Sequence, residues 1–330
     1  MLRRFLVFLL ASAVIGLTVF AGWLVLFVHK SVVPPTAPFE ISIEHGSTLK
    51  GAAREIAASG MPISAWQFEL MARLMGKQRN IKAGTYEVEG PITPFQLLSK
   101  IRRGDATQSE ITFIEGSTFV QIRKLLANNP GVKQVTAGLA NDAILKAIGA
   151  HETNPEGLFF PDTYIFSSGM SDIAILKRAY HAMQTRMAKE WDKRATNLPY
   201  KTSYEALIMA SIVEKETGKP EERRRIAGVF VNRLKRGMKL QTDPTVIYGM
   251  GAAYDGNIHK RNLTTDTAYN TYTRLGLPPT PIAMPGLGAI EAALRPALTE
   301  ELYFVSKGDG SHYFSKSLEE HNRAVAKYQK

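Results

Sequence analysis

The chain contains no cysteine, so disulfide frameworks, thiolate metal sites and cysteine nucleophiles are all excluded. Its seven histidines are scattered without the H-x-x-x-H kind of spacing that dedicated zinc sites use. We therefore expect no metal and no cofactor. Long runs of like charge are also missing, although the net charge is +11. This balance is typical of a solvated basic surface, and it would also suit anionic lipid headgroups or an acidic polymer.

An uncharged, apolar run covers Phe5–Val28 near the N-terminus. At 1.5 Å per residue, the run is long enough to cross a bilayer core of about 30 Å. Arg3 and Arg4 precede it, which favours an N-terminus in the cytoplasm and a chain outside it after Lys30. A cleaved signal peptide is the alternative, but the run is longer than an h-region and no small-x-small site follows directly. Residues 1–30 are thus predicted to be a cytoplasmic tail and transmembrane anchor, which argues against a nucleic-acid partner.

The next segments are predicted to be a spacer and a small subdomain. Residues 31–38 hold Pro34, Pro35 and Pro38, which is typical of a short, stiff linker. Residues 39–108 follow the order strand, helix, helix, strand, with a third helix after it. The predicted elements are a strand at 39–43, helices opened by Thr48, by a Ser64/Gln67 capping box and by Thr93 with Gln96, and a strand at 83–88. This order and size match LysM glycan-binding modules.

The remaining 109–330 form one larger predicted domain, so the fold class is α+β with a single N-terminal transmembrane helix. Three long helices are expected, followed by a hairpin and a closing helix: 171–191, 202–218, 220–237, 302–305 with 312–314, and 317–328. The stretch from Pro130 to Glu156 reads as loop. Glu156–Phe166 is either a core strand with a turn or the wall of a cleft. Leu240–Pro285 shows little regular periodicity and is predicted to be a long functional loop region.

The helix at Thr202–Gly218 carries the main candidate for chemistry. Only Ser211 is polar between Ala206 and Val213, so the middle of this helix should be buried. Its last turn holds Glu214 and Glu216, which lie about 200° apart around the axis and cannot both face one substrate bond. One acid is expected to work and the other to support it.

The end of this helix is a suitable place for a general acid. The negative end of the helix dipole and partial burial both raise a carboxyl pKa, and a general acid must hold its proton near neutrality. The sharp junction with the next helix would fix the side chain of Glu216. The alternative is a solvated helix end at which Glu214 or Glu216 pairs with Lys215 or Arg223.

The loop region adds candidates for binding a sugar chain. Tyr248, Tyr269 and Tyr272 offer flat ring faces, while Asp243 and Asn270, with Thr271, offer hydrogen bonds to hydroxyl and N-acetyl groups. Ordinary turn chemistry explains each of these residues equally well, since Asp-Pro and Asn-Thr pairs favour turns.

Four motifs occur in the order ASIVEKET, LQTDPTVIYGMG, TAYNTY and GLPP, after an EG-x-F-x-PDTY stretch. Together they resemble the endolytic murein transglycosylase family (MltG, YceG-like) over nearly the full length. The resemblance implies that the catalytic acid is the second one of IVEKE, Glu216. Supporting or substrate-binding roles would then fall to Glu214, Gln241, Asp243, Tyr248, Tyr269, Asn270 and Tyr272. The family often has Gly and Asn in its proline-rich loop, where this chain has Thr280 and Met284, so no contacts are assigned there.

The resemblance also implies a function and a location. The enzyme would cleave MurNAc–GlcNAc bonds within nascent glycan strands and leave 1,6-anhydroMurNAc ends, using one Glu as acid and base and no metal. It would sit in the inner membrane as a single-pass protein with its catalytic domain in the periplasm. Its partners would be peptidoglycan strands, the membrane, and penicillin-binding proteins or other wall synthases.

Two other functions remain open from the residues. An ordinary muramidase would use Glu216 as acid and Asp243 as nucleophile or base, and would need the two carboxyl groups about 5–9 Å apart. A glycan-binding scaffold would hold wall-synthesis enzymes near the membrane and cut nothing.

Overall fold

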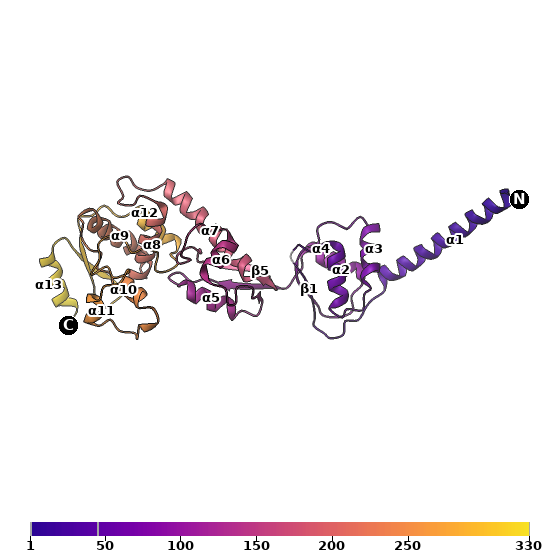
Figure 1. Cartoon of the computed structure of the whole chain (residues 1–330), viewed down its shortest axis with the longest axis horizontal. Helices are drawn as coiled ribbons and strands as arrows, with labels where there is room; N and C mark the ends of the chain where they lie inside the picture. Colours follow the sequence, from indigo (N-terminus) through magenta and orange to yellow (C-terminus); the bar gives the residue numbers. More distant parts are fainter. Residues whose placement is uncertain (1, 45, 330) are drawn as a thin grey trace. The chain divides into compact units, whose positions relative to one another are not determined.

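The computed structural model describes residues 2–44 and 46–329, with side chains described at 8, 10–44 and 46–329 (Figure 1). It divides into two compact units. Unit 1 comprises Met1–Glu110, Gly131–Lys133 and Ile165–Met170, and unit 2 comprises Ile111–Pro130, Gln134–Tyr164 and Ser171–Lys330. Helices and two-stranded sheets occur together in the chain, which agrees with the predicted α+β class.

The first helix, α1 (Leu2–His29), contains the apolar run. Within the residues that the structure describes, it is the one helix long and apolar enough to cross a membrane, over Leu10–His29. Its apolar side chains are largely uncovered by protein, since Leu10, Leu17 and Leu26 are each about 70% exposed. A helix with this surface is consistent with a single-pass membrane anchor.

Unit 1 has the predicted order of elements. These are β1 (Phe39–Ile43), α2 (Leu49–Ala58), α3 (Ala65–Leu74), β2 (Gly84–Val88) and α4 (Pro94–Arg103). Strands β1 and β2 are antiparallel, with Phe39 opposite Val88. Thr93 and Gln96 form the predicted capping box, whereas the predicted box at Ser64 is wrong because Ser64 makes no side-chain cap bond. The core includes Ile41, Phe68 and Tyr86, and Leu24 and Phe27 of α1 pack against it.

Two pairs of short strands form in the middle of the chain. Strand β3 (Gln108–Thr112) pairs with β5 (Thr163–Ser167), and β4 (Val132–Lys133) pairs with β6 (Met170–Ser171). The helix α5 (Phe119–Ala127) follows β3. The segment predicted as loop contains a further helix, α6 (Asn141–Ile148), which buries Ile144, Leu145 and Ile148. This helix spans barely two turns, too short for an apolar period to be recognised.

Unit 2 is built around α8 (Ser203–Glu216), whose residues from Ala206 to Val213 are all buried as predicted. It packs most extensively on α12 (Leu287–Leu294), whose small side chains let the two backbones approach, and also on α9 (Pro220–Lys235). Figure 1 shows α9 and α12 beside α8. The other elements of this unit are α7 (Asp172–Asp192), the antiparallel hairpin β7 (Tyr303–Ser306) and β8 (His312–Ser315), and α13 (Leu318–Tyr328).

The predicted loop region contains more helix than expected. It holds α10 (Asp243–Met250), the 3-10 turn η1 (Gly251–Ala253) and α11 (Lys260–Thr264). Pro244 occupies the first turn of α10, and Thr245 and Val246 are buried. An Asp-Pro pair fits the start of a helix as well as a turn, and here Asp243 begins α10 and not a turn.

Candidate active site

Glu216 lies at the last position of α8, at a sharp junction with α9. Thr217 leaves the helix in an extended conformation and is buried. Its hydroxyl accepts a hydrogen bond of 3.0 Å from the backbone N–H of Lys219, and Pro220 then begins α9. The backbone on both sides of Glu216 is therefore fixed by ordered helices, which restricts where its side chain can point.

The carboxyl group of Glu216 is half-buried and accepts a hydrogen bond from the hydroxyl of Thr242. Burial raises its pKa from 4.5 to about 7, and the negative charge of Asp243 pushes the pKa in the same direction. The bond from Thr242 and the positive charge of Arg233 oppose the shift. At neutral pH the group is thus poised between its acid and base forms, as proton transfer in both directions requires.

A buried network of hydroxyl groups positions Thr242. Its N–H donates to the hydroxyl of Thr271 at 3.0 Å, and its carbonyl accepts from the hydroxyl of Thr245 at 2.8 Å. The hydroxyls of Thr245 and Thr271 lie 2.9 Å apart, and both residues are buried. From the sequence, Thr271 is expected only to offer hydrogen bonds to a sugar, and Thr242 is not singled out. Nothing local in the sequence indicates which of these threonine hydroxyls will donate a hydrogen bond to a carboxylate.

Asp243, Tyr272 and Gln241 surround this contact. Asp243 is exposed, and its carboxylate accepts a 2.5 Å hydrogen bond from the hydroxyl of Tyr272. Gln241 has a positive φ of 51° and places its side-chain oxygen 3.3 Å from a guanidinium nitrogen of Arg233. The structure therefore brings Asp243, Gln241 and Tyr272 into the neighbourhood of Glu216. Their supporting or substrate-binding roles stay predictions.

Arg233 is a buried cation that the sequence did not single out. It is 8% exposed and donates to the carbonyls of Leu302 at 2.6 Å and Leu240 at 2.8 Å. Burial lowers its pKa. Because its donors are used by backbone carbonyls, it holds the segment before Thr242 against the hairpin and acts on Glu216 through its charge.

Glu214 has a different set of partners from Glu216. Its carboxylate accepts from the N–H of Gly286 at 2.8 Å and lies 3.2 Å from the guanidinium of Arg223. Burial raises its pKa, and these two partners oppose the rise. Glu214 thereby ties the end of α8 to α9 and to the segment before α12. Glu214 and Glu216 thus point to different neighbours, as expected of two residues that are two positions apart on one helix.

Tyr248 packs on Tyr269 and reaches a second carboxylate, Glu156. The rings of the two tyrosines are 4.8 Å apart in an edge-on arrangement, and the hydroxyl of Tyr269 lies 2.9 Å from that of Thr280. Glu156 accepts from the hydroxyl of Tyr248 at 3.1 Å and from the N–H of Phe119 at 2.9 Å. It is only 4% exposed, and burial raises its pKa to about 7.

Asn270 is almost fully buried at 1% exposure. Its amide nitrogen donates to the carbonyls of Asn262 at 3.0 Å and Thr265 at 2.6 Å, and its oxygen accepts from the N–H of Tyr272 at 2.9 Å. These contacts fold the loop that carries Tyr272. Any direct contact of Asn270 with a sugar stays a prediction.

A groove of about 520 Å³ lies along the N-terminal half of α8. Its walls include Tyr204, Ile208, Leu277 and Pro278, and Glu205 also lines it. Glu205 precedes Glu216 by about three helical turns, which places it on the same face of α8 and about 16 Å away along the axis. Met209 and Ile212, on the same face between Glu205 and Glu216, are fully buried, so the groove ends before it reaches Glu216.

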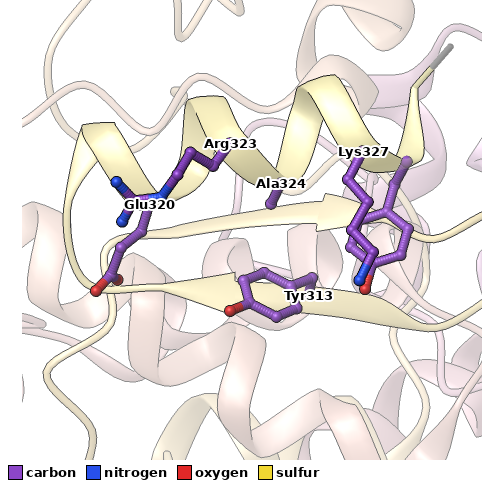
Figure 2. Close-up of a pocket in the computed structure, with 6 residues that line it drawn as sticks. Tyr313, Glu320, Arg323, Ala324 and Lys327 are labelled. Carbon is purple, nitrogen blue, oxygen red and sulfur yellow. The ribbon is translucent and has the colours of Figure 1, made fainter.

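A separate cavity of about 300 Å³ lies between β8 and α13 (Figure 2). Tyr313 faces the underside of α13, and Glu320, Arg323 and Lys327 line the cavity from the helix. None of the predicted site residues lines it. We therefore assign it no part in the site at Glu216.

The chain is similar to several known proteins. The sequence model of the YceG-like family matches residues 41–327. A Bacillus subtilis protein named endolytic murein transglycosylase is 33% identical, over 87% of this chain and 84% of its own length. A Streptococcus pneumoniae protein of the same name is 27% identical, and the match covers 58% of its length. A crystal structure of a YceG-like protein from Listeria monocytogenes aligns with a TM-score of 0.54 at 29% identity, covering 88% of this chain and all of that one.

Proposed function

The chain belongs to the YceG-like family, and we propose that it is an endolytic peptidoglycan lytic transglycosylase with Glu216 as its single acid and base. The observation that carries the proposal is the half-buried carboxyl of Glu216, held at a helix junction with a pKa of about 7. The shared name of the curated relatives supports the substrate, murein, and the position of cleavage within the strand.

The first step breaks the glycosidic bond. Protonated Glu216 gives its proton to the oxygen that links MurNAc to GlcNAc, so that the GlcNAc side leaves as an alcohol. Positive charge then develops on C1 and the ring oxygen of MurNAc. The carboxylate of Glu216 remains beside this cation and is stabilised by the hydrogen bond from Thr242.

The second step closes a bond within the same sugar. The C6 hydroxyl of MurNAc attacks C1, and its proton passes to the Glu216 carboxylate, which restores the starting acid. No water is consumed, so no second carboxylate is needed to activate one. The bond broken and the bond formed share C1, and the 1,6-anhydro product is one water lighter than a reducing end.

Asp243 has an electrostatic role in this scheme. Its charge favours the protonated form of Glu216 before the first step and stabilises the cation that follows. The hydrogen bond from Tyr272 holds the Asp243 carboxylate in place. The same exposed carboxylate would be the nucleophile or base of a muramidase, which is the second candidate function.

The groove beside α8 suits a glycan strand that extends beyond the bond being cut. The ring of Tyr204 and the apolar faces of Ile208 and Leu277 can pack on sugar rings and N-acetyl methyl groups, while Glu205 offers an acceptor for hydroxyls. Cleavage within a strand requires binding on both sides of the bond. The groove lies about three helical turns from Glu216 and would take sugars remote from the bond being cut.

The remaining chain would place this site at the wall. We propose that α1 anchors the protein in the inner membrane with its N-terminus in the cytoplasm, so that unit 2 lies in the periplasm. We further propose that residues 39–108 act as a LysM-like glycan-binding subdomain and 109–330 as the catalytic domain. The β-α-α-β order of unit 1 supports the first assignment.

Replacement of the acid tests the proposal. Glu216→Gln keeps the shape and the bond from Thr242 but cannot donate or accept the catalytic proton. We expect the full-length variant to release fragments from murein more slowly by roughly 10²–10⁴-fold. Glu319→Gln, on the exposed face of α13, is the matched control and should cleave normally. A folded Glu216→Gln chain with full activity would overturn the assignment. A wild-type chain that binds murein and releases nothing would favour the scaffold.

A further inference from the structure

Two tryptophans stack where α1 meets the rest of unit 1. The ring centroids of Trp23 in α1 and Trp66 in α3 are 5.4 Å apart, with the planes only 9° from parallel. Trp23 also stacks on Phe27 at 6.1 Å. Despite the stack, Trp66 remains 60% exposed. A large aromatic side chain on the surface of a folded unit is thus held against the helix that is expected to cross the membrane.

The position of Trp23 along α1 sets the depth of Trp66 relative to the apolar span of that helix. The apolar span runs to His29, and Trp23 precedes that end by about 9 Å at 1.5 Å per residue. Trp66, stacked face to face on Trp23, lies at a similar level along the axis of α1. If this span is in the bilayer, the exposed ring of Trp66 must lie in the lipid and not in water.

The rest of the exposed face of α3 has matching chemistry. Arg73 and Leu74 follow Trp66 at helical spacings that put all three on one side of α3. Leu74 is 56% exposed and Met75, the C-cap, is 39% exposed, and beside them Arg73 is paired with Glu69 of the same helix at 2.8 Å. Apolar side chains with an aromatic ring and a long basic side chain are typical of helices that lie in the headgroup region of a bilayer.

A groove completes this surface. Its volume is about 610 Å³, and it lies between α1 and α3. Trp23, Leu26 and Phe27 give it an apolar wall, while Lys30 stands at the end of α1 and Gln67 comes from α3. An acyl chain fits the apolar wall, and a phosphate fits the ammonium group of Lys30.

We propose that unit 1 is seated in the membrane interface, with the exposed face of α3 (Trp66, Arg73, Leu74 and Met75) buried among the phospholipids of the leaflet from which α1 emerges. The inference rests on α1 crossing the membrane, which is part of the proposed function. It adds that α1 is not a free tether. Leu24 and Phe27 of α1 are packed on the core of unit 1. Unit 1 is therefore held next to the membrane and contacts its lipids directly.

The three tryptophans of the chain supply the test. Full-length protein is prepared in three single-tryptophan forms, each with the other two positions changed to Phe so that a ring remains. Each form is placed in vesicles of phosphatidylethanolamine and phosphatidylglycerol whose acyl chains carry bromine, which quenches nearby indole fluorescence. We expect strong quenching and blue-shifted emission for Trp23 and for Trp66. Trp191, in α7 of unit 2, is the reference for quenching without insertion.

The outcomes separate this inference from the anchor itself. Quenching of Trp23 with water-like, unquenched emission of Trp66 would overturn the seating of unit 1 and leave the anchor intact. Absence of quenching at both positions would overturn both statements. A second variant tests whether quenching of Trp66 depends on the exposed face of α3. Leu74→Asp in the Trp66 form should reduce the quenching of Trp66 to about half or less. The same change in the Trp23 form should leave the quenching of Trp23 unaltered. Equal quenching of Trp66 with and without Leu74→Asp would count against the docked face.

Discussion

Glu216 takes its reactivity from the balance of a few neighbouring groups. Burial and the charge of Asp243 raise its pKa, and Thr242 and Arg233 lower it, so the result is about 7. The three neighbouring groups come from different parts of the chain. Asp243 begins α10, Thr242 lies in the segment before it, and Arg233 is near the end of α9. Because the acid form is the reactive one, the rate should fall as pH rises through this pKa.

Removal of the charge at Asp243 tests this balance. In Asp243→Asn one influence that raises the pKa of Glu216 is lost, so the basic limb of the kcat/KM profile should move to lower pH. The expected displacement is on the order of half a pH unit, the size of a screened charge interaction near a protein surface. Asp309→Asn, in the exposed β7–β8 turn, should leave the limb in place. An unmoved limb in Asp243→Asn would show that the two carboxylates are not coupled.

Glu156 should make the stability of unit 2 depend on pH. Its pKa is about 7 in the folded chain and close to 4.5 when unfolded, so the folded state binds more protons between these values. The free energy of unfolding should therefore fall as pH rises from about 4.5 to 7, and level off above that, by on the order of 3 kcal/mol from this group. Glu216 adds a fall of the same sign.

The variant Glu156→Gln isolates the first contribution. It keeps an oxygen for the N–H of Phe119 but cannot ionise, so its denaturation midpoints should fall less steeply between pH 5 and 8 than those of the wild type. Equal pH slopes for variant and wild type would mean that Glu156 does not carry a raised pKa. Glu55→Gln, in α2 of unit 1, is a suitable control for the loss of a carboxylate.

At the scale of elements, α9 depends on a close approach at Gly228. A Cβ atom there would meet the carbonyl oxygen of Ala297 at 2.7 Å and the methyl of Thr299 at 2.9 Å. Gly228→Ala should therefore lower the free energy of unfolding by about 1–2 kcal/mol despite the better helix propensity of Ala. Gly51→Ala in α2 is the matched control, because its nearest contact is 3.6 Å and it should stabilise by about 0.5–1 kcal/mol. Stabilisation by both changes, measured by denaturant unfolding, would contradict the tight packing of α9.

The groove beside α8 predicts a dependence on strand length. Tyr204→Ala removes a ring from its wall and should raise KM for long glycan strands by about tenfold, with kcat little changed, as expected for lost uniform binding. Tyr204→Phe keeps the ring and should behave like the wild type. Short fragments that do not reach the groove should be cleaved equally by all three proteins. An identical KM for long strands in Tyr204→Ala would remove the groove from the glycan path.

Most helices and strands followed from local signals, because a cap and an apolar period act within a few residues. Thr93 with Gln96, and Gly104 at φ 80°, bound α4 as expected. The missed elements are short or share signals with turns, as α6 and α10 do. The capping box predicted at Ser64 failed because a local pattern allows a hydrogen bond without requiring it.

The whole site depends on contacts that sequence cannot supply. Glu216 was identifiable from its place at the end of a buried helix and from the family motifs. Thr242, Arg233 and Glu156 were not, since each meets its partner only after segments distant in sequence fold together. Glu156 and Tyr248, for example, are joined across the chain from the region before β5 to α10. Gln241 was identified only through the family motif, whereas Asp243 was also identified by its capacity to bond sugar hydroxyls.

At the scale of the whole molecule, the proposed function is that of a membrane-anchored enzyme that cuts glycan strands without consuming water. The most direct test is mass spectrometry of the fragments that the full-length protein in detergent releases from uncrosslinked glycan strands. We predict fragments with 1,6-anhydromuramic acid ends, one water lighter than reducing ends. Reducing ends would contradict it and would assign the second carboxylate of a hydrolase to Asp243.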